Sequence, residues 1–138
     1  AQVLPLLRAV AQAQQSYYLA NGTYSYSFDN LDIQIPWTEK ETPFSCADAD
    51  VRSNADWSLS INSTVANPMW IWARRMNGNY EGSGIFIPLD TNWDGQEPGR
   101  IYCSDSRPYQ NGYCREVFGV TAGQGNMGCV MYHKEALF

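Results

Sequence analysis

The strongest constraint on the fold is a change in the period of the apolar residues after Gly22. Before it, apolar residues recur at steps of three and four from Val3 to Tyr17, which is the spacing of one face of an α-helix. Asn21-Gly22 then gives a stop signal, because glycine readily adopts the left-handed conformation that ends helices. The pattern predicts one long helix over residues 2–21.

Beyond this point apolar and polar residues alternate, as they do along strands with one buried face. Asn77-Gly78 adds a hairpin signal between two such runs. The expected strands cover residues 57–62, 69–74, 84–87 and 101–103. A short helix at 113–118 and a last edge strand at 130–132 are also expected, with irregular segments at 36–54, 90–100 and 119–128.

One helix followed by a run of antiparallel strands predicts an α+β fold, with the helix packed on one face of a sheet of about four strands. A chain of 138 residues has room for one core of ordinary size. Residues 1–138 are therefore expected to form a single domain, with the helix at 2–21 and the sheet and its loops at 22–138. No apolar run in the chain approaches the roughly 18 residues of a membrane span.

The charge balance excludes several classes of partner. Nine basic residues against fourteen acidic ones give a net charge of −5, and only Lys40 and Lys134 are lysines. Proteins that bind nucleic acid normally show the opposite balance, because they must neutralise phosphates. We therefore expect no nucleic-acid partner, and an anionic membrane surface is disfavoured for the same reason.

The four cysteines indicate an exported protein. Cys46, Cys103, Cys114 and Cys129 are well separated and form no C-x-x-C motif, which argues against a zinc site. In a small acidic chain they are best interpreted as two disulfides; the alternative is four reduced thiols. Of the three pairings we favour Cys103–Cys114 with Cys46–Cys129, because Cys103 ends one expected element and Cys114 begins the next.

Asp90, Asn92 and Asp94 alternate ahead of Gly95 and match the first half of a calcium loop, D-x-[DN]-x-[DN]-G. This spacing aims several oxygens at one point, which suits a hard cation. The glutamate expected at the twelfth position is absent, because Ile101 stands there. The same residues also fit a plain solvated turn. Calcium is thus one of two alternatives, and no cofactor is required.

Other polar and aromatic groups do not suggest catalysis. His133 has no acidic or cysteine neighbour in motif spacing, so no catalytic residue can be named and no enzyme is expected. The acidic cluster is expected on the solvated surface, and the tryptophans are expected in the sheet and its cover rather than in a sugar-binding platform. The acidic cluster consists of Asp48, Asp50 and Asp56, and the tryptophans are Trp57, Trp70 and Trp72.

Two neighbouring stretches carry a recognisable motif: residues 9–24 read AVAQAQQSYYLANGTY and residues 28–33 read FDNLDI. Both resemble the type IV pilin family. In that family a stretch A-x-A-Q-x-x-Y-Y-x-x-N-G-x-Y closes a long N-terminal helix, and F-x-x-L-D-I follows. Residues 113–119, YCREVFG, are similar to the cysteine-containing turn near the end of several pilins.

The resemblance implies a non-enzymatic structural subunit of an extracellular pilus, held in the inner membrane before assembly. Identical subunits would associate in a helical filament through an N-terminal helix upstream of Ala1. We expect that upstream segment to hold a short basic leader, a Gly-Phe-type cleavage site and roughly 20 mostly apolar residues. Ala1-Gln2 is a poor helix cap, which fits a helix that continues upstream.

Two alternatives accompany this interpretation. The first is a minor pilin or a pseudopilin of a type II secretion system. Major pseudopilins carry calcium in a comparable late loop, which favours calcium at Asp90, Asn92 and Asp94. The second is a secreted carbohydrate- or calcium-binding module that uses the tryptophans and the same loop.

Overall fold

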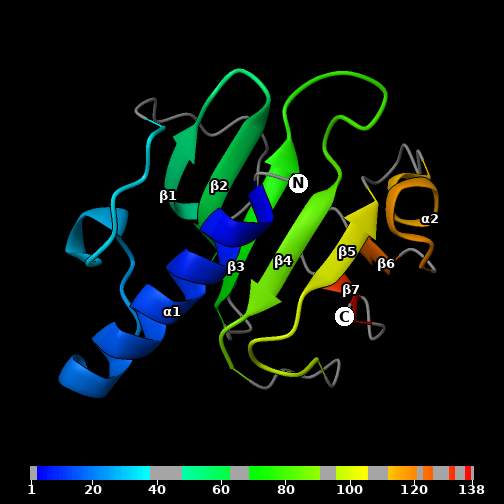
Figure 1. The fold of residues 1–138 in the computed structure, drawn as a ribbon. Helices are drawn as coiled ribbons and strands as arrows, with labels where there is room; N and C mark the ends of the chain where they lie inside the picture. The colour runs from blue at the N-terminus through cyan, green and yellow to red at the C-terminus, as the bar shows by residue number, and fades with distance from the viewer. Residues whose placement is uncertain are drawn as a thin grey trace.

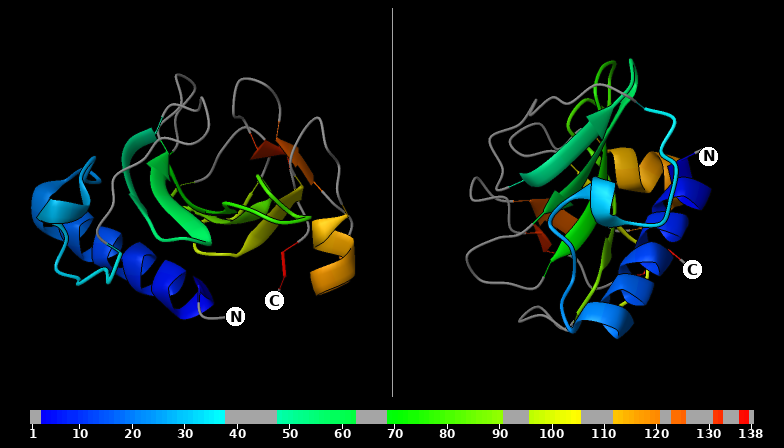
Figure 2. Two further views of the ribbon diagram at one scale, coloured as in Figure 1. Left: turned by 90° about the horizontal axis from the view of Figure 1, so that it is seen from above. Right: turned by 90° about the vertical axis from the view of Figure 1, so that its left-hand side faces the viewer.

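One long helix lies along one side of a curved sheet (Figures 1 and 2). The helix, α1, spans Val3–Asn21, and a 3₁₀ turn, η1, spans Phe28–Asn30. This computed structural model describes residues 3–37, 48–62, 69–90, 96–105, 112–120, 123–125, 131–132 and 136–137. The remaining elements are β1 (Asp48–Ser53), β2 (Trp57–Asn62), β3 (Trp70–Arg75), β4 (Gly84–Pro88), β5 (Tyr102–Asp105), α2 (Tyr113–Phe118), β6 (Gly123–Gly125) and β7 (Met131–Tyr132).

The sheet follows the order of the chain, β1-β2-β3-β4-β5-β6-β7. Neighbours from β1 to β5 are antiparallel, β6 is parallel to β5, and β7 is antiparallel to β6. The parallel step needs a crossover connection, and α2 lies within it. The predicted α+β class is confirmed, but among the described residues the antiparallel run from β1 to β5 contains five strands rather than about four.

The extra strand, β1, lies in a segment that we expected to be irregular. Val51 is its buried apolar residue, whereas the neighbouring Arg52 and Ser53 are buried and polar. No alternation of apolar residues therefore marks the strand, which is held by its ladder with β2. A second correction concerns the glycine-rich stretch 119–128, which contains β6. That three-residue strand consists of Gly-Gln-Gly and shows no side-chain pattern.

The hairpin between β3 and β4 is present, but its connection is longer than a two-residue turn at Asn77-Gly78. The N–H of Arg75 donates to the carbonyl of Ser83, and the N–H of Gly82 donates back to the carbonyl of Arg75. These bonds extend the ladder beyond the strand ends, so the turn occupies the residues between them.

The face of the sheet toward α1 is aliphatic. Alternation along β3 and β4 places Ile71, Ala73, Ile85 and Ile87 on this face, all of them buried. The helix buries one stripe of residues against them: Val3, Leu7, Val10, Ala11 and Gln14. Burial of one Val or Leu side chain stabilises a fold by about 1.5–3 kcal/mol, so this contact is a major part of the core. Among the described residues, no helix has the length and apolarity needed to cross a membrane.

The opposite face of the sheet is aromatic and polar. Trp70, Trp72, Phe86 and Tyr102 form a separate buried cluster there. Phe86 and Tyr102 stack with ring centroids 5.6 Å apart. The buried guanidinium of Arg74 lies 4.4 Å from the centre of the Trp72 ring, a cation–π contact. The expected placement of these tryptophans in the sheet is confirmed.

Gln14 is the polar member of the buried helix stripe, and it fastens the chain that follows the helix. Its amide nitrogen donates to the carbonyl of Ser25, and its amide oxygen accepts from the N–H of Ser25, both at 2.8 Å. Between them the chain turns at Gly22, whose φ of 75° suits glycine and whose N–H donates to the carbonyl of Tyr18. The helix end is thus closed by one glycine and one buried amide.

We predict that Gln14→Ala lowers the free energy of unfolding by about 2–3 kcal/mol, because both backbone groups of Ser25 lose their buried partners. Urea denaturation followed by circular dichroism measures the change. Gln12→Ala, at an exposed position on the same helix, is the matched control and should change stability by less than about 0.5 kcal/mol. Equal losses in the two variants would contradict the assigned role of Gln14.

Candidate functional sites

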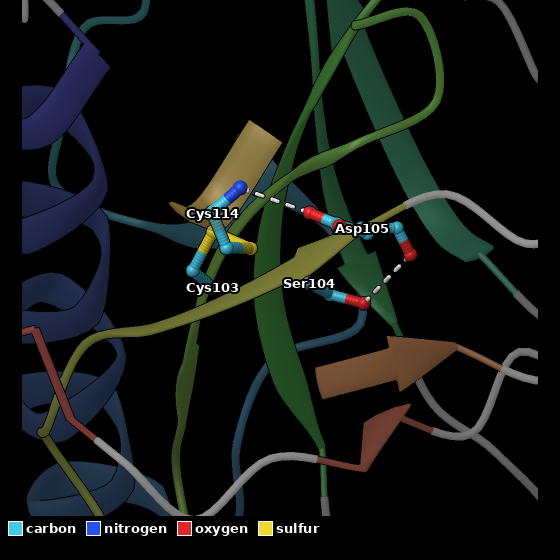
Figure 3. The surroundings of a disulfide bond; sticks show 4 residues. All are labelled: Cys103, Ser104, Asp105 and Cys114. Carbon is cyan, nitrogen blue, oxygen red and sulfur yellow. Dashed lines mark hydrogen bonds between the residues drawn. A yellow bond between two sulfur atoms is a disulfide. The ribbon is translucent and has the colours of Figure 1, made fainter. Parts of the chain in front are cut away.

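A disulfide joins Cys103 on β5 to Cys114 on α2 (Figure 3). This is one of the two bonds favoured from the sequence. The other expected pair, Cys46 with Cys129, lies outside the described residues. Closing a loop of this length stabilises a protein by about 3 kcal/mol in the chain-entropy model. The bond therefore fixes the short α2 to the sheet.

Asp105 adds a second tie between β5 and α2. Its carboxylate is buried and accepts a hydrogen bond from the backbone N–H of Cys114 at 2.9 Å, as Figure 3 shows. That N–H belongs to the first turn of α2, where helix donors have no partner within the helix. One aspartate thus caps the helix that the disulfide holds in place.

The predicted calcium loop lies mostly outside the described residues. Asp90 is exposed and follows directly after Leu89, just beyond the end of β4. Asn92 and Asp94 are not described. Among the residues that are described, no group of three or more His, Cys, Asp or Glu side chains lies close enough to hold a metal ion. Calcium at Asp90, Asn92 and Asp94 stays a prediction.

The acidic cluster does not lie wholly on the surface, which corrects our expectation for Asp50. Its side chain is only 11% exposed and accepts hydrogen bonds from Arg52 at 2.6 Å and from the backbone N–H of Phe28 at 2.8 Å. Arg52 also pairs with Asp29 at 2.9 Å. Asp56 is exposed, as expected. No sequence pattern marks this network, because Phe28 and Asp29 belong to η1, far along the chain from Asp50 and Arg52 of β1.

Burial by itself would raise the pKa of Asp50, since it disfavours the charged carboxylate. Hydrogen bonds from the N–H of Phe28 and from Arg52, together with the positive charge of Arg52, outweigh that effect. The pKa of Asp50 is lowered below its ordinary value of 3.8. The carboxylate is therefore charged and structural, tying η1 to β1.

The tryptophans of β3 are not available as a ligand platform. Trp70 is fully buried, and its indole N–H donates to Gln96. Trp57, on β2, is half-buried, and the guanidinium of Arg75 lies 5.0 Å from the centre of its ring.

His133 lies outside the described residues.

Exposed apolar side chains gather instead around the end of α1. Leu19 is 86% exposed, Tyr26 56% and Tyr18 43%. The period of the apolar residues did not predict this exposed group. The one available signal was the density of tyrosine between residues 17 and 26.

No protein-family model, curated protein or solved structure matches this chain. Its function has to be inferred from its own residues.

We predict that the stabilising effect of Asp50 disappears in acid. A carboxyl whose pKa is lowered on folding stabilises the fold above its unfolded pKa, and that effect is lost as the pH falls through the folded pKa. The difference in unfolding free energy between wild type and Asp50→Asn should be constant above about pH 5 and shrink below pH 3.8. Asp56→Asn, at an exposed aspartate, is the control. A difference for Asp50→Asn that does not vary with pH would contradict the assignment.

Proposed function

We propose that this chain is the head domain of a type IV pilin-like filament subunit, and that its function is assembly rather than catalysis. The observation that carries the proposal is the position of the residues that resemble pilins. All three stretches lie at joints where a helix or a loop is fastened to the sheet.

The first stretch closes α1. Gln14 holds Ser25 through two hydrogen bonds, and Asn21 donates its side-chain N–H to the carbonyl of Tyr17. The hydroxyl of Tyr24 then donates to the carbonyl of Leu89 at 2.8 Å, which joins this loop to the chain beyond β4. The motif therefore ends the helix and returns the chain to the sheet.

The second stretch anchors the next segment. Phe28 and Leu31 are buried in the core shared with α1. Asp29 pairs with Arg52 of β1. The apolar residues of the motif thus point into the core, while Asp29, at an unspecified position of the motif, reaches the edge strand β1.

The third stretch forms α2. Cys114 is bonded to Cys103 of β5, and Gly119 ends the helix in the left-handed conformation at a φ of 72°. A helix held by a disulfide, as α2 is, suits a subunit that works outside the cell, because disulfides persist in oxidising surroundings.

The sheet covers α1 on one side only. Gln12, Gln15, Ser16 and Leu19 are exposed on the helix. In a filament such a helix lies toward the filament axis, and neighbouring subunits cover the side that the sheet leaves open. In this proposal identical subunits associate mainly through an apolar segment that continues α1 toward the N-terminus, and that segment holds the subunit in the inner membrane before export to the cell surface.

A minor pilin or a type II secretion pseudopilin would use the same surfaces and is the alternative within the proposal. In either form of the proposal, calcium at Asp90, Asn92 and Asp94 is an optional ligand. An identical melting temperature in millimolar calcium and in chelator would contradict the calcium prediction. The rival carbohydrate-binding module is weakened because Trp70 and Trp72 are buried.

We predict that Leu19→Lys, introduced into the complete native gene, reduces the number of surface filaments about tenfold or more. Leu19 is exposed on α1, so a charge there should hinder packing between subunits without unfolding the domain. Electron microscopy with antibodies against residues 1–138 counts the filaments, and a thermal melt of the isolated chain checks folding.

Val117→Lys is the matched control, because Val117 is also an exposed apolar residue but lies on α2, at the other end of the sheet (Figure 1). This variant should assemble like the wild type. Absence of labelled filaments on wild-type cells, or normal filaments from Leu19→Lys, would overturn the proposal.

A further inference from the structure

A small open hollow lies beside the C-terminal end of α1, where the chain turns back toward the sheet. Its volume is about 150 Å³. Three tyrosines dominate its wall. The described residues that line it are Tyr18, Gly22, Thr23, Tyr24, Tyr26, Met69 and Asp90. We refer to this set as the tyrosine hollow.

The groups around the tyrosine hollow favour positive charge. The C-terminus of a helix carries the negative end of the helix dipole, and the last turn of α1 contains no basic residue. Asp90 contributes a carboxylate: burial raises the pKa of Tyr24, and the negative charge of Asp90 adds to that effect. None of the described lining residues is basic.

Two of the three rings, those of Tyr18 and Tyr24, are held in place before any ligand arrives. The hydroxyl of Tyr24 donates to the carbonyl of Leu89 and accepts from the side chain of Gln15. The ring of Tyr24 packs on that of Tyr18 with centroids 4.7 Å apart. Met69 is buried beside them. A fixed wall lowers the entropy that a ligand would otherwise lose in ordering it.

Aromatic faces attract cations, and the attraction is greatest for large, weakly hydrated cations such as quaternary ammonium groups. A hard metal ion needs several oxygen ligands, whereas the described wall offers one carboxylate beside three tyrosine rings. Cavities of about 150 Å³ accept a group the size of benzene, which a trimethylammonium group resembles. We propose that the tyrosine hollow binds an alkylated ammonium group, such as the head group of choline. Binding at this site does not require filament formation, so the inference does not depend on the proposed function.

The test is a titration of the 138-residue chain with choline in the presence of chelator. ¹H–¹⁵N NMR spectra monitor the titration. The matched probe is 3,3-dimethyl-1-butanol, which has the shape of choline but carries no charge. Choline should shift the amide signals of residues 18–26 and of Met69 and Asp90 in a saturable way. The neutral probe should bind at least about fivefold more weakly.

Variants separate the rings from the carboxylate. Asp90→Asn should weaken choline binding about fivefold, and Tyr26→Leu about two- to fivefold, because both side chains are exposed and solvent screens them. Tyr26→Phe keeps the ring and Asp56→Asn removes a distant exposed charge, so both should bind like the wild type. Equal shifts with choline and its neutral analogue, or no saturable shift at these residues, would overturn the inference whether or not the protein forms filaments.

Discussion

The fold depends on one contact, between the aliphatic face of the sheet and a single stripe of α1. Alternation along β3 and β4 sends Ile71 and Ile85 to one face, and the helix covers them with Leu7 and Val10. If the helix were removed, this face would meet water. The position of α1 therefore determines where the following loop must run, and where the open side of the helix faces.

Polar side chains then hold the segments that have little apolar pattern of their own. Gln14 fixes the loop after the helix, Arg52 ties β1 to η1, and the Cys103–Cys114 bond fixes α2 to β5. Each tie bridges residues that are separated along the chain. In the proposed subunit this arrangement makes the head rigid, so that assembly can depend on the helix alone.

The sequence predicted α1, β2 and β3 because their apolar residues recur with a regular period, and β4 and β5 because each contains a short apolar run, although these strands are buried on both faces. It failed for β1 and β6, whose residues carry no apolar alternation and which depend on pairing with neighbours. The role of Asp50 was missed because its partner Phe28 lies in η1, 22 positions away along the chain. The tyrosine hollow was missed for the same reason, since Tyr24 and Leu89 meet across 65 positions of the chain.

The most direct test of the filament account is the native reading frame upstream of Ala1. If the chain is a pilin-like head, that frame should encode a short basic leader, a Gly-Phe-type cleavage site and roughly 20 mostly apolar residues that continue α1 as one helix. A start codon directly before Ala1, or an ordinary secretory signal peptide ending there, would contradict the account and favour a secreted binding module.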